Sequence, residues 1–178
     1  MPLTQLDPVS ALIVIDLQKG IVGLPAAHPI ADVVGRSAQL ARAFRERGLP
    51  VVLVNVSDRA PGRTDQGPLK FAFPPDWTEL VPELEQQPGD YLVTKKRVGA
   101  FIGTTLDEYL RERGVTQIVL MGVATSAGVE ATARSAYDLG YNVTLVVDAM
   151  TDMQPMRINI VWRKSFRGLA RRARPKMY

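Results

Sequence analysis

Short apolar runs alternate along the chain with stretches in which apolar residues recur at helical spacing. The apolar runs are rich in Val, Ile and Leu and cover residues 11–16, 50–56, 90–95, 116–123 and 142–149. Runs of this kind are typical of strands buried on both faces of a parallel sheet. The helical spacing covers residues 29–48, 104–114 and 126–140. This alternation predicts an α/β fold, a three-layer, doubly wound parallel sheet with helices on both faces.

Polar or glycine-rich residues stand at the ends of three predicted strands. Asp16 ends the first run, Lys95 ends the third, and the turn Gly122–Gly128 (GVATSAG) lies at the end of the fourth. In a parallel sheet the ligand site lies beyond the carboxyl ends of the strands. We therefore expect Asp16, Lys95 and Gly128 to meet in one candidate site. The long polar loop over residues 57–77 is also expected to serve a function, because compact domains rarely carry loops of this length.

Composition narrows the chemistry that this site can perform. The length of 178 residues and the apolar content of 46% suit one globular domain. The absence of cysteine excludes disulfides, thiolate metal sites and cysteine catalysis, and the single histidine, His28, excludes a site that needs two imidazoles. No apolar run approaches the roughly 20 residues of a membrane span, and the N-terminus lacks a signal-peptide pattern. We therefore expect a cytoplasmic protein that does not contact a membrane.

The positive net charge of +4 comes from one end of the chain. All 18 acidic residues lie at or before Asp152, whereas eight of the 22 basic residues follow Met153. Residues 1–153 therefore carry 14 basic and 18 acidic side chains, a net charge of −4. Because the basic surplus belongs to residues 154–178 alone, we predict no nucleic-acid-binding surface across the fold.

Four motifs occur in a specific order and spacing from Ala11 to about Met153. They are IDLQ, the pattern D-x-x-V-x-K-x-R-x-x-A-F, GTTLDEYLRERGV and GVATSAGVEATARSAYDLGYNVTLVVDAMTD. Through them the chain resembles the isochorismatase-like hydrolase superfamily. The resemblance implies a parallel sheet of about six strands, a small-molecule substrate and a homodimer or larger homo-oligomer. It also implies a non-proline cis peptide between Val123 and Ala124.

The resemblance assigns roles to the three residues at the strand ends. In amidase-type members an Asp, a Lys and a Cys form a catalytic triad, and these roles map onto Asp16, Lys95 and Gly128. Glycine offers no nucleophile, so the thiol mechanism is excluded. The isochorismatases proper also lack the cysteine and hydrolyse a vinyl ether by protonation. In that interpretation Asp16 is a general acid kept partly protonated by burial, which raises a carboxyl pKa, while the ammonium of Lys95 lowers it.

The same motifs indicate further binding residues, although each also has a purely structural interpretation. The expected substrate-binding residues are Gln18, Arg97, Phe101, Val123, Ala124 and Ser126. Ser126 is also an alternative nucleophile paired with Lys95. No cofactor is expected, and no metal, because the nicotinamidase-type relatives bind a metal with an Asp and two histidines that the loop after the second strand lacks.

Residues 154–178 differ from the rest of the chain, since they are basic, carry no acidic side chain and show weak periodicity. Read one base back, codons compatible with this tail encode ADAHQHSVEKEFPRLGETGT, which resembles the segment that related proteins carry there. We therefore hypothesise a −1-type reading-frame change near Met153, with a poorly packed tail or one docked on a partner subunit as the consequence. The alternative is a genuine basic tail that binds acidic partners.

Two functions remain open from the sequence. The first is an isochorismatase-like hydrolase of a small molecule that uses Asp16 and Lys95 as an acid–base pair without a cysteine nucleophile. The second is a catalytically silent pseudoenzyme or small-molecule-binding protein on the same fold. A buried Asp16–Lys95 pair beside a small-molecule cavity favours the first, whereas a site filled by side chains favours the second.

Overall fold

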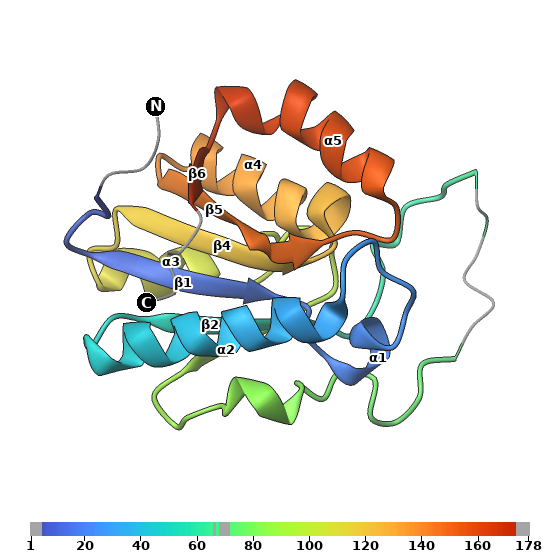
Figure 1. Cartoon of the computed structure of the whole chain (residues 1–178), viewed down its shortest axis with the longest axis horizontal. Helices are drawn as coiled ribbons and strands as arrows, with labels where there is room; N and C mark the ends of the chain where they lie inside the picture. The colour runs from blue at the N-terminus through green and yellow to red at the C-terminus, as the bar shows by residue number, and fades with distance from the viewer. Residues whose placement is uncertain (1–4, 66, 68–71, 174–178) are drawn as a thin grey trace.

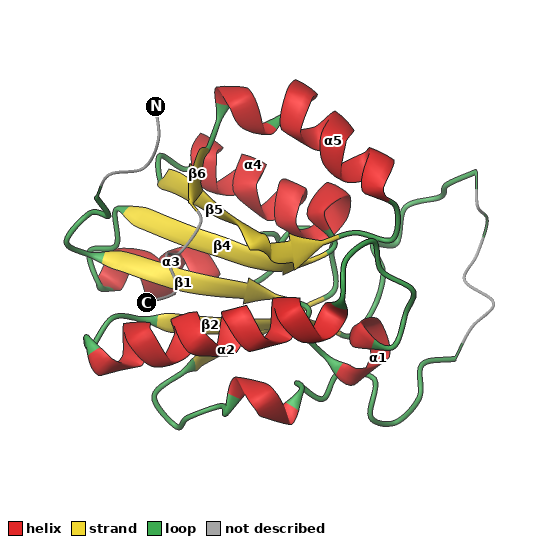
Figure 2. Cartoon of the chain, viewed as in Figure 1, coloured by secondary structure: helices red, strands yellow, loops and turns green. Residues whose placement is uncertain are grey.

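The computed structural model describes residues 5–65, 67 and 72–173, and its centre is one six-stranded sheet. The strands are β1 (Ser10–Ile15), β2 (Val51–Val56), β3 (Tyr91–Lys95), β4 (Gln117–Val123), β5 (Asn142–Thr151) and β6 (Arg171–Ala173). They lie in the order β3-β2-β1-β4-β5-β6, and all neighbours are parallel. The predicted α/β fold with a doubly wound parallel sheet is confirmed (Figures 1 and 2).

Helices cover both faces of this sheet. They are α1 (Lys19–Val22), α2 (Ile30–Glu46), α3 (Leu106–Glu112), α4 (Glu130–Asp138) and α5 (Pro155–Lys164), with short turns η1 (Pro82–Leu84), η2 (Thr125–Val129) and η3 (Phe166–Gly168). Figure 1 shows α2 along one face of the sheet and α4 and α5 along the other. Within the described residues, no helix is both long and apolar enough to cross a membrane.

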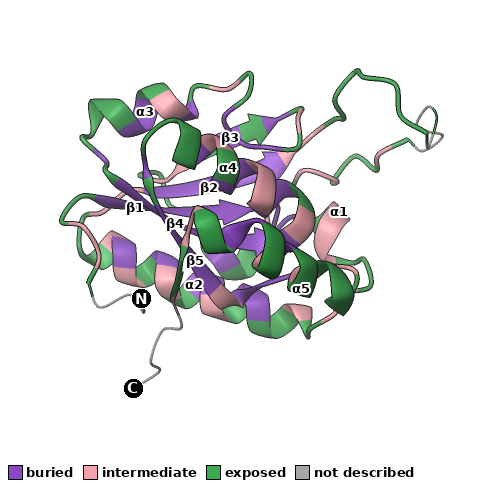
Figure 3. Cartoon of the chain, turned by 90° about the horizontal axis from the view of Figure 1, so that it is seen from above, coloured by how far each residue is buried: buried purple, intermediate pink, exposed green. Residues whose placement is uncertain are grey.

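The alternation of side chains along β1 explains the two layers. Leu12 and Val14 point into the cluster that packs under α2, whereas Ile13 and Ile15 point into the cluster that packs under α3 and α4. All four side chains are at most 1% exposed. A strand buried on both faces needs apolar residues at every position, which is why the run reads as continuous rather than alternating. Figure 3 shows the buried strands between the partly exposed helices.

The strand order changes direction between β1 and β4, which are adjacent although β2 and β3 lie between them in sequence. Open α/β sheets bind ligands at such a switch point. Here Ile15 pairs with Gly122, whose φ is +116°. A Cβ atom on Gly122 would lie 2.1 Å from the Ile15 carbonyl oxygen, so only glycine lets the ends of the two strands approach this closely.

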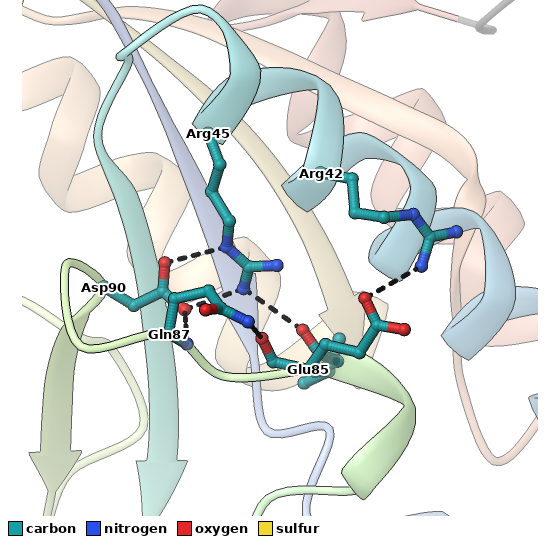
Figure 4. A network of polar contacts seen from close by, with 6 residues as sticks. Arg42, Arg45, Glu85, Gln87 and Asp90 are labelled. Carbon is teal, nitrogen blue, oxygen red and sulfur yellow. Dashed lines mark hydrogen bonds and ion pairs between the residues drawn. The ribbon is translucent and has the colours of Figure 1, made fainter.

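A partly buried ion pair fixes the start of β3 at the opposite edge of the sheet. Arg45 of α2 donates from Nε to Oδ1 of Asp90 at 2.9 Å and from Nη2 to Oδ2 at 2.7 Å (Figure 4). Oδ2 of Asp90 also accepts the backbone N–H of Gln87 at 2.8 Å. Asp90 directly precedes Tyr91, so this network holds the strand that ends in Lys95.

The C-terminal segment packs better than we expected. Phe166 is fully buried and its ring contacts Trp162 edge-on, with centroids 4.9 Å apart, while Arg171–Ala173 adds the sixth strand beside β5. The outer face of α5 nevertheless exposes Met156 and Ile160, at 66% and 47%. The reading-frame hypothesis stays a prediction. Sequencing the gene across Met153 tests it, and one intact frame shared with close relatives would contradict it.

Candidate functional site

Asp16 and Lys95 meet at the carboxyl end of the sheet, as predicted. Asp16 follows the last residue of β1, and Lys95 is the last residue of β3. The Lys95 Nζ atom lies 2.8 Å from Oδ2 of Asp16, and the two side chains are only 2% and 8% exposed. Nζ also donates to the Arg97 carbonyl oxygen at 3.3 Å. The backbone of Asp16 has a φ of +53°, a conformation that non-glycine residues adopt rarely and that often marks a functional residue.

The Asp16 carboxyl is only half satisfied. Its Oδ2 atom meets Lys95, whereas Oδ1 is buried and has no hydrogen-bond partner among the described residues. Burial raises the pKa of Asp16 to about 6, although the nearby ammonium of Lys95 opposes this change. Burial therefore outweighs the ion pair, which the sequence alone does not decide. A carboxyl with a pKa near 6 exchanges protons readily close to neutral pH.

Gly128 lies beside this pair, in the single π-helical turn η2 that leads into α4. A Cβ atom built on Gly128 would lie 2.9 Å from Cγ2 of Ile15 and 3.3 Å from Oδ2 of Asp16. The turn is held in place because Oδ2 of Asp152 accepts the Ser126 N–H at 2.7 Å. The peptide between Val123 and Ala124, directly before η2, is cis, as predicted.

A cavity of about 390 Å³ opens above these residues. Six of the nine predicted site residues line it, namely Asp16, Lys95, Arg97, Val123, Ala124 and Gly128. Its size suits a small organic molecule. The structure therefore brings the residues at the ends of β1, β3 and β4 together around one space.

The other three predicted residues do not line this cavity. Gln18 is fully buried, donates to the Val56 and Trp77 carbonyl oxygens and accepts the Val56 N–H. Phe101 lies in the core, 6.0 Å from the ring of Tyr141. Ser126 donates its backbone N–H to Asp152, and no hydrogen bond found among the described residues joins its hydroxyl to Lys95.

Two basic residues that line the cavity were not predicted from the sequence. Arg59 and Arg63 line the cavity from the loop that follows β2. The only sequence signal was the unusual length of that loop, since isolated arginines on a polar segment look like ordinary surface residues. No cluster of three or more His, Asp or Glu side chains able to hold a metal ion occurs among the residues that the structure describes.

Known proteins share this fold. The isochorismatase domain model matches residues 10–165. The chain belongs to the isochorismatase family. An isochorismatase-family protein from Burkholderia thailandensis has a similar structure, with a TM-score of 0.90 and 43% identity, over 95% of this chain and 93% of that one.

Curated relatives give less detail on activity. The uncharacterised family protein YwoC of Bacillus subtilis is 44% identical over 149 residues, which cover 80% of this chain and 77% of that protein. The ureidoacrylate amidohydrolase RutB of Variovorax paradoxus is 32% identical over 174 residues, which cover 81% of this chain and 69% of that protein. One relative is thus named as an amidohydrolase, and the family supports a hydrolase assignment without a named substrate.

Proposed function

We propose that this isochorismatase-family hydrolase acts on a small molecule through proton transfer by Asp16, without a covalent thiol intermediate. The observation that carries the proposal is the half-satisfied Asp16 carboxyl on the cavity wall. Its Oδ2 atom is held by Lys95, while its buried Oδ1 atom has no partner among the described residues. A proton on Oδ1 has no acceptor among the described residues, and in this proposal a bound substrate accepts it.

The proposed step follows from this geometry. With a pKa of about 6, roughly one Asp16 carboxyl in ten is protonated at pH 7. Asp16 donates this proton to the leaving atom of the substrate as the scissile bond breaks, and a water oxygen forms the new bond to carbon. The proton released by that water returns to Asp16. Lys95 stabilises the carboxylate in the interval through the 2.8 Å ion pair.

The surroundings of Gly128 support a mechanism without covalent attack. The glycine offers no nucleophile, and its Cβ position is closed by the buried Ile15 side chain. Ser126 does not line the cavity. Water is then the attacking group by default, and proton transfer is the catalytic contribution that remains for Asp16.

A catalytically silent binding protein is the second candidate, and the missing nucleophile favours it. Loss of the thiol removes the activity of an amidase-type site unless another mechanism takes over. The open cavity beside an intact Asp16–Lys95 pair favours the hydrolase, because a site without function has no reason to keep a buried, half-satisfied carboxyl.

A substrate panel of isochorismate, small amides and carbamates separates the two candidates. We expect hydrolysis of at least one class, a rate that falls about tenfold per pH unit above a pH of about 6, and a loss of about 100-fold or more in Asp16→Asn. A rate that rises through a pH of about 6 would make Asp16 a base instead of an acid. Hydrolysis that survives Asp16→Asn would remove the proposed mechanism.

A further inference from the structure

Asp152 is a buried carboxylate that takes no part in the proposed proton transfer. It directly follows β5, is fully buried, and forms no ion pair with any residue that the structure describes. A buried carboxylate without a cation needs hydrogen-bond donors in its place. Asp152 has two of them, since Oδ2 accepts the Ser126 N–H at 2.7 Å and Oδ1 accepts the Met153 N–H at 2.8 Å.

Both donors belong to segments that form the wall of the cavity. Ser126 lies in the turn η2, and its neighbours Ala127 and Gly128 line the cavity. Met153 lines the cavity from the segment that follows β5. Asp152 itself does not line it. One carboxylate behind the wall therefore joins two of the segments that make up the wall.

The turn η2 needs this support from outside its own sequence. Ala124 stands at the N-cap position and makes no side-chain cap hydrogen bond. Alanine has no side-chain acceptor, and the first N–H groups of a helix have no partner within the helix. Asp152 supplies the missing acceptor from the end of β5. A second and uncharged bond joins the same two elements, because Thr125 Oγ1 donates to the Thr151 carbonyl oxygen at 3.0 Å.

The place of this turn decides how well Asp16 is covered. The Cβ position of Gly128 lies 3.3 Å from Oδ2 of Asp16, and Asp16 is only 5% exposed. A turn that moved away from this position would admit water to the carboxyl. Burial is what raises the pKa of Asp16 to about 6, so a hydrated carboxyl would titrate closer to its ordinary value of 3.8.

We propose that Asp152 is a positioning residue of the site, which holds η2 in place so that Gly128 stays against Asp16 and keeps water from its carboxyl. The covering of Asp16 rests on geometry, and only the effect on turnover rests on the proposed function. A carboxylate suits this role because both of its oxygens accept hydrogen bonds. An asparagine has one oxygen, and its NH₂ group would face one of the two N–H donors.

Asp152→Asn tests this role through the titration of Asp16, followed by carbon-13 NMR. We expect the midpoint of Asp16 to fall by about one pH unit, and kcat/KM per folded molecule on any hydrolysed panel substrate to fall about tenfold or more. Asp90→Asn is the matched control, because it also removes a buried carboxylate that accepts a backbone N–H, but one that lies away from the cavity. We expect this control to leave the midpoint of Asp16 unchanged. An unchanged midpoint in Asp152→Asn, or an equal fall in both variants, would overturn the proposal.

Thr125→Val separates the position of the turn from the charge of Asp152. This variant removes the neutral bond to Thr151 and keeps the carboxylate. We expect the Asp16 midpoint to fall in the same direction, by about half a pH unit. A fall in Asp152→Asn with none in Thr125→Val would assign the effect to the lost charge and contradict the proposal. Since valine is close to threonine in size, Thr125→Val decides the question even where Asp152→Asn fails to fold.

The same measurements distinguish failure of this proposal from failure of the proposed function. A lowered Asp16 midpoint in Asp152→Asn and Thr125→Val, without hydrolysis of any panel substrate, would remove the hydrolase and keep the positioning role. Hydrolysis that depends on Asp16, with the same midpoint in Asp152→Asn and the wild type, would keep the hydrolase and remove the positioning role. A wild-type midpoint near 3.8 would remove both.

Discussion

Two buried aspartates of this fold make ion pairs of almost the same length, yet their surroundings differ. Asp90 lies 2.7 Å from Arg45, and Asp16 lies 2.8 Å from Lys95. Both oxygens of Asp90 accept hydrogen bonds, three in total from Arg45 and Gln87 (Figure 4). Asp16 instead keeps one buried oxygen without a partner in the described residues.

The difference shows how an ion pair can serve structure in one place and chemistry in another. A carboxylate with all its acceptors filled is stabilised as a charge, and it holds the elements that supply the donors. A carboxyl that is desolvated and has a hydrogen-bond partner at only one of its two oxygens is less stable as a charge. Its pKa therefore rises, to about 6 in the case of Asp16. Asp90 thus joins α2 to β3, whereas Asp16 faces the cavity at the switch point of the sheet.

Removal of the Asp90 charge is expected to give the largest change in stability. Asp90→Asn leaves the Arg45 guanidinium, only 17% exposed, without its counter-charge, and we expect a loss of about 3 kcal/mol in the free energy of unfolding. Turnover per folded molecule is expected to stay within about twofold of wild type, in contrast to Asp16→Asn. Urea unfolding and an assay on the panel substrates measure the two effects.

The neighbouring exposed pair supplies the control for Asp90. Glu85 meets Arg42 at 3.3 Å, and both side chains are about half exposed, at 55% and 49%. Glu85→Gln is expected to change stability by less than about 0.5 kcal/mol. If Asp90→Asn costs no more than Glu85→Gln, the network in Figure 4 does not hold the two elements together.

The pH dependence of stability is the next effect in size. The pKa of Asp16 rises from 3.8 to about 6 on folding, so folding favours the protonated form. The resulting stabilisation is full below a pH of about 4 and is lost as the pH rises through about 6. We expect the stability of the wild type relative to Asp16→Asn to fall by about 2 kcal/mol from about pH 4 to about pH 7. A difference that stays flat, or increases with pH, would show that Lys95 outweighs burial.

Alanine substitutions at two glycines are expected to give the smallest changes in stability. Gly128→Ala places a methyl group 2.9 Å from Cγ2 of Ile15, and we expect it to cost about 1–2 kcal/mol. Gly35→Ala lies in the middle of α2 with open space around it, and we expect it to stabilise the protein by about 1 kcal/mol. If both substitutions stabilise the fold, the site beside Asp16 has room for a side chain.

A restored thiol extends this test. Gly128→Cys carries the same Cβ atom and therefore requires Ile15 to shift. Amidase activity gained by Gly128→Cys would support descent from the branch of the family that uses a cysteine.

The fold could be predicted because most of its strands can be recognised from their local sequence alone. The five predicted runs match β1 to β5 within two residues at each end. The signal is clearest in β1, β2 and β4, which are buried on both faces and therefore consist almost wholly of apolar residues. The family resemblance implied about six strands, but the sequence did not place the sixth, Arg171–Ala173, in the C-terminal tail. Its three residues are two arginines and an alanine, and nothing in that composition separates a short edge strand from a coil.

Site residues that stand at strand ends could be predicted from the sequence, whereas the other site residues were harder to predict. Asp16, Lys95 and Gly128 follow from the rule that parallel strands end at one edge. Gln18 and Phe101 lie in the same motifs but turn into the fold, because burial of a side chain depends on tertiary packing that spacing does not encode. Arg59 and Arg63 reach the cavity from a loop, and the path of a loop has no periodic signal.

The direct test of the account is the titration of the Asp16 carboxyl itself. Carbon-13 labelling of aspartate side chains, with Asp16→Asn to assign the resonance, follows its chemical shift against pH by NMR. We predict a midpoint at a pH of about 6, which would identify Asp16 as the group that exchanges protons in the cavity. A midpoint near the ordinary value of 3.8 would contradict it, because Asp16 would then be a permanent carboxylate that differs little from Asp90 in role.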